Sequence, residues 1–183
     1  PFLGSVDLGF FYYILAAVFI VGMVNAVNFT DGIDGLNTSV TLVVALVFSV
    51  IAMLLNRVGL SLYAAAIVGA MIGFLFWNAN PAKVFMGDTG SLFLGGAVCA
   101  LAFDVDMPIL LILIGIIYIV EILSVVLQVT YFKISHGKRI FKMAPIHHHF
   151  EMCGWNENKI CFVFSGVTLF AGIIGVLLAV FGC

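Results

Sequence analysis

Long apolar runs dominate this chain and decide what it can fold into. A helix needs about 20 apolar residues to cross the roughly 30 Å hydrocarbon core of a bilayer. Five runs are close to that length, and they cover residues 8–27, 38–55, 60–77, 108–129 and 160–181. A sixth run, residues 92–103, reaches it only if its helix begins near Phe85 or Gly87, with residues 87–91 as the first turn. We therefore expect an all-α membrane bundle with six transmembrane helices.

The composition supports a membrane protein and excludes several other classes. Only 9% of the residues are charged, whereas a soluble domain carries about 25%. The chain has no basic run and a net charge of -2, so no nucleic-acid partner is expected. Its four cysteines lack the spacing of a zinc site or a disulfide framework. We expect a single transmembrane domain over residues 1–183, with the lipid bilayer as its surroundings.

The number of helices predicts which loops share a side of the membrane. Loops 28–37, 78–91 and 130–159 fall on one face, and the short loops 56–59 and 104–107 fall on the other. Six of the seven basic residues lie on the first face, which the positive-inside rule makes cytoplasmic. All four histidines lie there too. This pattern is typical of an enzyme at the cytoplasmic surface of the inner (plasma) membrane, because transporters place polar groups near the midplane.

The first polar cluster follows the first apolar run. Its members recur at every third position and so share a helix face: Asn25, Asn28, Asp31 and Asp34. Gly32 and Gly35 favour a turn that a ligand can approach closely. The two carboxylates could bind a cation or hold basic partners. The alternative is a helix C-cap followed by an N-cap with solvated acids, but polar groups at the end of a membrane helix are costly and favour a site.

The second cluster spans residues 78–91 and includes Asn78, Phe85 and the Gly87-Asp-Thr-Gly-Ser91 stretch. Backbone N–H groups at a helix N-terminus attract phosphate. Asp88 would repel an anion there unless a cation such as Mg²⁺ lies between them, and Mg²⁺ commonly takes one or two carboxylates and completes its shell with phosphate oxygens. This stretch predicts a diphosphate site with Asp88 as its metal ligand. The alternative role for Asp88 is that of a helix N-cap.

The third cluster contains three consecutive histidines, His147, His148 and His149. On a helix, successive side chains turn by about 100° and cannot all face one metal. In an extended loop, His147 and His149 would point to one side and His148 to the other. The rings could bind phosphate, bind a metal or move protons. A solvated loop is the alternative.

Two polar residues interrupt the apolar run 108–129. Gln128 lies near its cytoplasmic end and could line the site. Glu121 lies deeper and could be functional, since buried carboxylates in membrane segments usually are, or could be a neutral, hydrogen-bonded packing residue. We leave Glu121 outside the expected site.

These three clusters, in this order, resemble the phospho-N-acetylmuramoyl-pentapeptide transferases, a branch of the polyprenyl-phosphate N-acetylhexosamine-1-phosphate transferase superfamily. The matching stretches are residues 28–36, 78–91 and 144–151. The superfamily shares the first two in looser form, whereas the unbroken His-His-His-Phe-Glu run is similar to the muramoyl-pentapeptide branch. Members of this family have ten transmembrane helices, and the chain resembles the last six. We therefore expect the N-terminal part, with its aspartate pair, to lie outside these 183 residues.

The resemblance implies a reaction of cell-wall (peptidoglycan) synthesis. Undecaprenyl phosphate would attack UDP-N-acetylmuramoyl-pentapeptide, giving the lipid-linked muramoyl diphosphate, lipid I, and UMP with Mg²⁺ as cofactor. The assembly it implies is a homodimer. The implied catalytic residues are Asp31, Asp88 and His148, with Asp88 holding the metal. The implied substrate-binding residues are Asn25, Asn28, Asp34, Asn78, Phe85 (on the uracil ring), Gln128, His147 and His149.

Three rival functions make different predictions. A sister transferase would move N-acetylglucosamine-1-phosphate onto the same lipid, and the donor that it accepts would reveal it. A divalent-cation transporter would need carboxylates at mid-membrane on several helices, where only Glu121 qualifies. A purely structural subunit would be indifferent to Asp88→Asn and His148→Ala.

Overall fold

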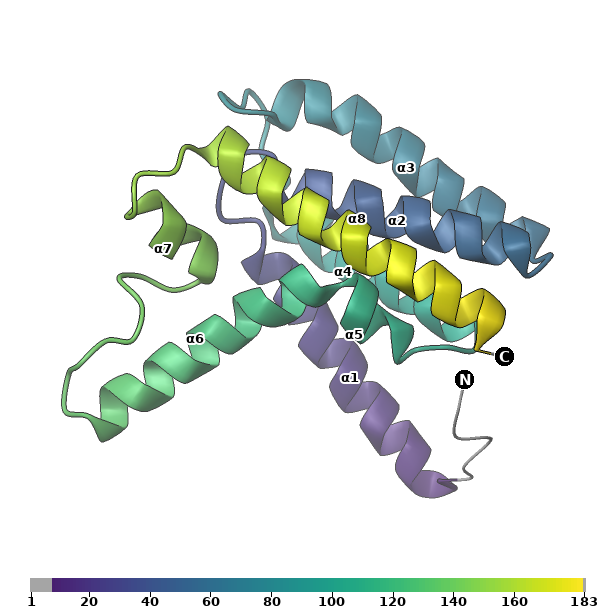
Figure 1. The fold of residues 1–183 in the computed structure, drawn as a ribbon, viewed down its shortest axis with the longest axis horizontal. Helices are drawn as coiled ribbons and strands as arrows, with labels where there is room; N and C mark the ends of the chain where they lie inside the picture. The colour runs from purple at the N-terminus through teal and green to yellow at the C-terminus, as the bar shows by residue number, and fades with distance from the viewer. Residues whose placement is uncertain (1–7, 183) are drawn as a thin grey trace.

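The structure is a computed structural model that describes residues 8–182, and every regular element within them is helical. The expected all-α architecture is therefore confirmed. The helices, in chain order, are α1 (Phe10–Phe29), α2 (Leu36–Leu54), α3 (Val58–Asn78), α4 (Gly87–Asp104), α5 (Leu110–Ile114), α6 (Ile116–Ile134), α7 (Ile146–Glu151) and α8 (Glu157–Phe181) (Figure 1).

Five of the described helices, α1, α2, α3, α6 and α8, are long and apolar enough to cross a membrane. The chain is thus a multi-pass membrane protein. Helix α4 begins at Gly87, as the sequence predicts, and its 18 residues span about 27 Å. It is more polar than the other five because it has Asp88 in its first turn and ends with Asp104. By composition, five helices rather than six qualify as spans.

Helix α2 forms the centre of the bundle. It is packed against α3, α8 and α4, and most of its residues are buried, including Phe48 and Ile51 with no exposed surface. These helices run side by side in Figure 1. The other face of α2 is open, with Leu46, Met53 and Leu54 exposed. Its N-terminus at Leu36 follows directly on the Asp-Gly segment, so a rigid element supports that segment.

Helices α1 and α6 point away from the bundle (Figure 1). The apolar run 108–129, expected to be one continuous helix, is instead broken at Gly115, so that prediction is wrong at this point. Gly115 ends α5 and begins α6, with φ −90° and ψ 28°. A Cβ atom there would lie 2.7 Å from the carbonyl oxygen of Leu111, so only glycine fits the bend. The bend redirects α6, which carries Glu121 and Gln128.

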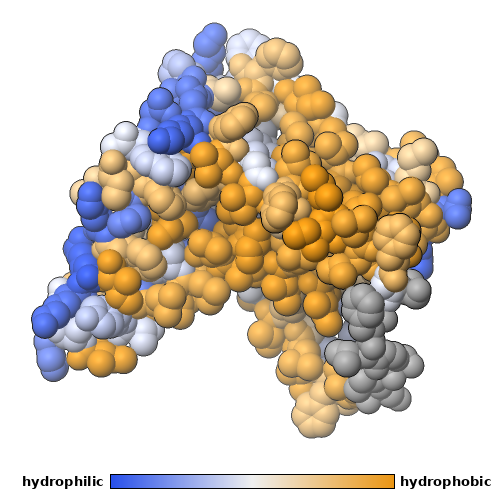
Figure 2. Space-filling model, viewed as in Figure 1, coloured by the Kyte–Doolittle hydropathy of each residue, from blue (hydrophilic) through white to orange (hydrophobic). Residues whose placement is uncertain are grey.

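The two ends of the bundle differ in polarity. Figure 2 shows hydrophilic residues gathered along the edge formed by α7, the end of α6 and the start of α8, while the rest of this face is mostly apolar. At the opposite end, Arg57 joins two short loops. Its Nη2 atom lies 2.5 Å from Oδ2 of Asp106, and its Nη1 atom donates to the backbone oxygen of Asp104. The polar groups that could bind substrate or take part in catalysis therefore lie at the end of the bundle opposite Arg57.

Candidate functional site

The segment between α1 and α2, residues 30–35, forms a turn that we call the Asp-Gly turn. Gly35 has a positive φ of 74°, which glycine adopts without strain. The carboxylate of Asp34 accepts hydrogen bonds from the backbone N–H of Ala82 at 2.8 Å and from Asn80 at 3.3 Å. The backbone N–H of Asp34 donates to Glu157 at 2.9 Å. Asp34 therefore ties the turn to loop 79–86 and to α8, and the alternative of a simply solvated carboxylate is wrong for it.

Asn78 also contacts the loop of residues 79–86. It is buried at the end of α3, where its side-chain oxygen accepts a hydrogen bond from Thr38 at 2.5 Å. Its amide nitrogen donates to the backbone oxygen of Val84 at 3.1 Å. These contacts fix the chain that leads into α4 against the start of α2.

The first turn of α4 contains Asp88. Met86 occupies the N-cap position, and no side chain caps the helix, so the alternative of Asp88 as an N-cap is wrong. Asn28 instead connects this turn to α1, because its amide donates to Asp88 Oδ1 at 3.1 Å and to Ser91 Oγ at 2.8 Å. Asp88 is otherwise exposed, and its free oxygen faces outward from a helix N-terminus that attracts anions.

Asp31 is close enough to Asp88 for the two charges to interact. The pKa of Asp31 is raised from 3.8 to about 6, mainly by burial; a hydrogen bond with Asn37 lowers it, and the negative charge of Asp88 adds to the rise. A cation between two neighbouring carboxylates relieves the repulsion between their charges. The pair thus has the electrostatics of a cation site.

A divalent cation would not find a complete protein shell at this place. Within residues 8–182, no three His, Cys, Asp or Glu side chains are grouped so that they could hold a metal ion. Mg²⁺ does not require such a group, since it usually takes one or two carboxylates and fills its octahedron with water and phosphate oxygens. Asp88 and Asp31 fit that type of site, in which the substrate supplies the remaining ligands.

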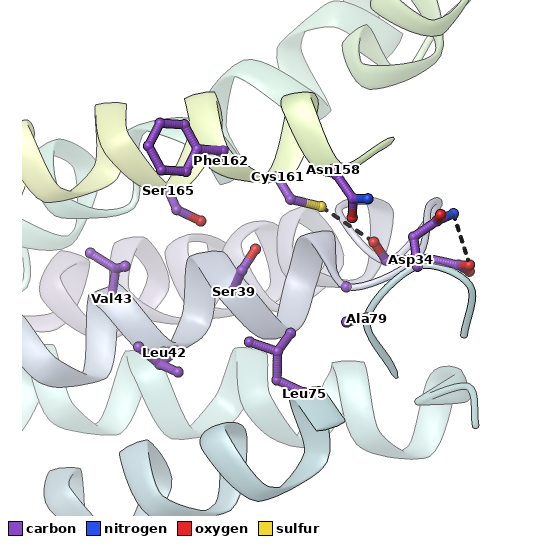
Figure 3. Close-up of a pocket in the computed structure, with 12 residues that line it drawn as sticks. Asp34, Ser39, Leu42, Val43, Leu75, Ala79, Asn158, Cys161, Phe162 and Ser165 are labelled. Carbon is purple, nitrogen blue, oxygen red and sulfur yellow. Dashed lines mark hydrogen bonds between the residues drawn. The ribbon is translucent and has the colours of Figure 1, made fainter. Parts of the chain in front are cut away.

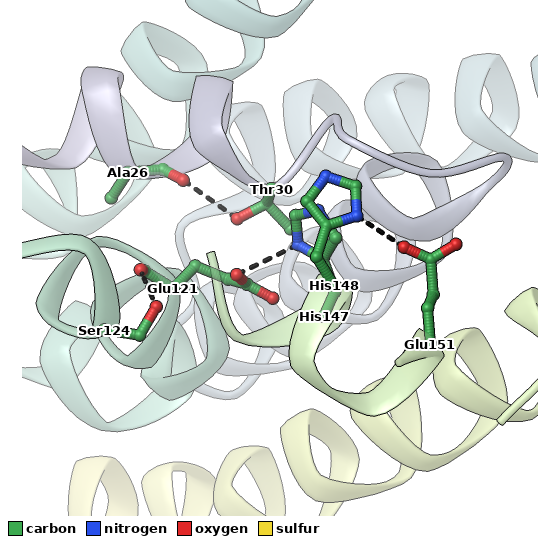
Figure 4. Close-up of polar contacts among 7 residues, drawn as sticks. All are labelled: Ala26, Thr30, Glu121, Ser124, His147, His148 and Glu151. Atoms are coloured by element: carbon green, nitrogen blue, oxygen red, sulfur yellow. Dashed lines mark hydrogen bonds and ion pairs between the residues drawn. The ribbon is translucent and has the colours of Figure 1, made fainter. Parts of the chain in front are cut away.

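The three histidines lie on the short helix α7, and each has a different partner. His147 Nδ1 lies 3.0 Å from Oε2 of Glu121, and His148 Nδ1 contacts Glu151 (Figure 4). His149 Nδ1 accepts a hydrogen bond from the backbone N–H of Lys142 at 3.1 Å. The three histidines therefore lie on a helix rather than in an extended loop, and their rings point in different directions. His147 is fully buried, and His148 is partly exposed.

The remaining expected site residues, Asn25, Phe85 and Gln128, have surroundings of their own. Gln128 holds the loop after α6, with its oxygen accepting from the N–H groups of Ile140 and Phe141 and its amide donating to Phe141. Asn25 is exposed and donates to the backbone oxygen of Val21 in its own helix. The ring of Phe85 is 73% exposed and borders a cavity of about 400 Å³ between α3 and α4.

Sequence reasoning missed several partners of these residues. Glu121 was left outside the site although it binds His147, and its only signal was a carboxylate inside an apolar run. Glu151 is three residues after His148, a spacing that brings side chains together only once the segment is helical. Glu157 carried no signal, because its partner Asp34 is distant in sequence.

A second cavity, of about 350 Å³, lies between α2, α3 and α8. Asp34 stands at its polar end, and Leu42 and Val43 line its apolar end (Figure 3). The thiol of Cys161 donates to the backbone oxygen of Asp34 at 3.3 Å and closes the cavity toward the turn. The Asp-Gly turn is therefore supported by α8 on this side.

Comparison with known proteins shows the family of the chain. Residues 1–106, more than half of the chain, match the family described as glycosyl transferase family 4. The chain belongs to that family. It is 55% identical over 170 residues to a phospho-N-acetylmuramoyl-pentapeptide-transferase of Clostridium perfringens, which covers 92% of this chain and 52% of the relative. The matched part is the relative's C-terminal part, as the resemblance implied.

Two further relatives carry the same name. One from Clostridium botulinum is 52% identical over 176 residues, covering 96% of the chain and 54% of the relative. One from Listeria monocytogenes is 49% identical over 177 residues, covering 97% of the chain and 55% of the relative. The chain thus spans about half the length of the curated relatives that it matches, and the family resemblance read from the sequence is confirmed.

Proposed function

We propose that this chain forms the cytoplasmic-side catalytic region of an enzyme that transfers phospho-N-acetylmuramoyl-pentapeptide from its UDP derivative to undecaprenyl phosphate. The observation that carries the proposal is the hydrogen bond between Asn28 and Asp88, since it joins the end of α1, just before the Asp-Gly turn, to the N-terminus of α4. A diphosphate needs cationic or N–H groups for its charge; the first turn of α4 supplies N–H groups, and Asp88 could hold a cation. The names of the relatives support this choice of substrates.

The donor's diphosphate would bind at the first turn of α4. Asp88, with Asp31 beside it, would hold Mg²⁺, which when bound neutralises charge on the phosphates and on the leaving UMP. Asn28 orients the Asp88 carboxylate, so the protein positions the ligand before substrate arrives. Phosphoryl transfer depends mainly on such positioning and charge neutralisation. Phe85, with its exposed ring, is available to stack on the uracil, and Asn78 fixes the loop that carries it.

The acceptor's phosphate and chain need both positive charge and an apolar surface. A cavity of about 400 Å³ at the cytoplasmic end of α6 offers both, because Lys133 and Arg139 line it together with Val129 and Phe132. Gln128 also lines it and holds the backbone of the adjoining loop. These contacts support a polyprenyl phosphate as the second substrate.

His148 would contact the reacting phosphates. Glu151 binds its Nδ1, which leaves Nε2 as the nitrogen available to donate a hydrogen bond or move a proton. His149 is bonded to the loop before α7 and would line the same region. We further propose that this end of the bundle faces the cytoplasm, where UDP-sugars are found, in the inner membrane. A homodimer stays a prediction.

The test is a transfer assay in membranes. It uses the gene at its full length and, in parallel, a chimera in which this chain replaces the matching C-terminal part of the Clostridium perfringens relative. We expect Mg²⁺-dependent formation of lipid-linked product and UMP from UDP-N-acetylmuramoyl-pentapeptide. Absence of transfer in both proteins, with the intact relative active, would contradict the proposal.

The same assay separates the rival functions. Transfer from UDP-N-acetylglucosamine alone would support the sister transferase instead. A cation flux in proteoliposomes that survives Asp88→Asn would support a transporter. The structure gives the transporter little support, since the carboxylates near one another, Asp31 and Asp88, lie at a helix end rather than inside a span.

A further inference from the structure

Glu121 and His147 form a buried pair that links α6 to α7. Neither side chain has any exposed surface, and His147 Nδ1 lies 3.0 Å from Oε2 of Glu121 (Figure 4). Burying ionisable groups inside a membrane protein is costly, and such groups are usually retained for function. The pair calls for an explanation, because α7 is only six residues long and could be anchored by apolar contacts alone.

His147 also contacts the Asp-Gly turn. A Cβ atom built on Gly32 would lie 2.3 Å from Nε2 and 2.7 Å from Cε1 of His147, so the ring is pressed against a position that only glycine can occupy. The imidazole is thus held between Glu121 on one side and the turn on the other. Three segments that are distant in sequence meet at this single ring.

The pair is incompletely satisfied. Within residues 8–182, Oε1 of Glu121 and Nε2 of His147 have no hydrogen-bond partner. An unpaired buried polar atom is destabilising, so an anchor selected for stability alone would be better built from apolar side chains. The bond to Glu121 instead fixes which way the ring points: with Glu121 ionised, Nδ1 carries the proton and Nε2 faces the turn.

The orientation of His148, the next residue along the chain, depends on this arrangement. The ring centroids of His147 and His148 lie 4.1 Å apart, and His148 Nδ1 is bound by Glu151. His148 is therefore fixed by a carboxylate from one side and by the ring of His147 from the other. A movement of His147 would move the ring of His148 relative to Asp31 in the turn.

We propose that Glu121 is a positioning residue: it holds the ring of His147 between α6 and Gly32, and thereby sets the orientation of His148 relative to the Asp-Gly turn. The expected effect on turnover rests on the proposed function, whereas the expected effect on the position of His147 does not. Glu121 touches no substrate in this account. Its effect on turnover passes through His147.

Three variants separate positioning from simple anchoring. Glu121→Leu removes the acceptor, Glu121→Gln keeps a side-chain oxygen for Nδ1, and Glu121→Leu combined with His147→Phe replaces the whole pair by apolar side chains. Such apolar replacements are often neutral or stabilising, so the double variant is expected to fold. Thr168→Val is the control, since Thr168 is buried in α8 and bonds only to the backbone of its own helix.

The kinetic readout is the split between kcat and KM in the transfer assay. We expect Glu121→Leu and the double variant to lose kcat by about 100-fold, the cost of a displaced catalytic group, with KM for the donor changed less than about threefold. Glu121→Gln and Thr168→Val should keep most of the wild-type kcat. A folded double variant with wild-type kcat would overturn the proposal, as would a Glu121→Gln variant as inactive as Glu121→Leu.

A second readout does not need activity. Diethyl pyrocarbonate modifies accessible histidines, and peptide mass spectrometry gives the rate at each ring, with exposed His136 as internal reference. We expect His147 to be protected in the wild type and in Glu121→Gln, and to react in Glu121→Leu. Equal protection of His147 in all three proteins would overturn the positioning role. If the wild-type protein transfers nothing, the proposed function fails while this measurement still decides the inference.

Discussion

The amide nitrogen of Asn28 donates a hydrogen bond of 3.1 Å to Oδ1 of Asp88, across 60 residues of sequence. The same amide reaches Ser91, one turn farther along α4. This contact joins the end of α1 to the start of α4 and leaves the second carboxylate oxygen of Asp88 free. The arrangement supports the proposed site, in which Mg²⁺ held by Asp88 would neutralise the donor's diphosphate.

Replacing Asp88 by asparagine should remove the metal ligand and keep the fold. Turnover with Mg²⁺ is expected to fall by about 100-fold or more, because the charge on the diphosphate is no longer neutralised. The thermal midpoint in detergent should change by less than about 3 °C, since Asp88 is exposed. The control is Asp106→Asn, an exposed carboxylate paired with Arg57 at the other end of the bundle, where turnover should stay normal.

Replacing Phe85 by alanine should weaken binding of the UDP donor. A stacked aromatic pair contributes about 0.5–1.5 kcal/mol beyond its buried area, so the Kd is expected to rise by about 2- to 12-fold. Phe170→Ala is the matched control, because Phe170 is an equally exposed ring on the lipid-facing surface of α8. Titration calorimetry with the nucleotide donor measures both. An unchanged Kd for Phe85→Ala would contradict a role for this ring in binding uridine.

The carboxyl group of Asp31 should make stability depend on pH in metal-free buffer. Burial, with the charge of Asp88, raises its pKa to about 6 in the folded protein, against 3.8 for the ordinary group. The folded state therefore holds a proton that the unfolded state has lost. The stabilisation is complete below about pH 3.8 and is lost as the pH rises through about 6.

Asp31→Asn has no such proton to lose, so its thermal midpoint should rise relative to that of the wild type between about pH 4 and pH 7. The measurement is thermal unfolding in detergent with EDTA over this range. A constant difference between the two proteins at all pH values would contradict the raised pKa of Asp31.

Replacing Gln128 by alanine should loosen the loop between α6 and α7. Three hydrogen bonds to Ile140 and Phe141 are lost, each contributing about 1 kcal/mol, so the loop should open at least about tenfold more often. Limited trypsin digestion at Lys138 and Arg139 measures this opening. Gln128→Glu is the matched variant, since its carboxylate still accepts from both N–H groups. It should be cleaved at a rate between those of the wild type and the alanine variant, and equal rates in all three would contradict the bracing role.

Much of the architecture could be predicted from the sequence, because a run of about 20 apolar residues leaves a chain few alternatives to a membrane helix. The start of α4 at Gly87 was also predicted, from glycines and hydroxyl residues that precede an apolar run. The break at Gly115 was not. An apolar run with one glycine looks the same whether the helix continues or bends, and only the contact with Leu111 decides it.

The candidate site residues stand out in the sequence, but the contacts between them do not. Asp31 and Asp88 each stood out by their glycine neighbours, yet nothing local shows that their charges interact. Gln128 was expected to face substrate, and the structure uses it to hold a loop backbone. The Glu121–His147 contact joins residues 26 apart, and such tertiary contacts leave no periodic pattern in the sequence.

The most direct test of the central claim is the affinity for UDP-N-acetylmuramoyl-pentapeptide with and without Mg²⁺, measured by titration calorimetry on the wild type and on Asp88→Asn. If the Asp-Gly turn and the first turn of α4 share one metal and one diphosphate, Mg²⁺ should tighten binding to the wild type by about tenfold or more and leave the variant unchanged. Equal affinity of the wild type in EDTA and in Mg²⁺, or a Mg²⁺ effect that survives in Asp88→Asn, would contradict the account.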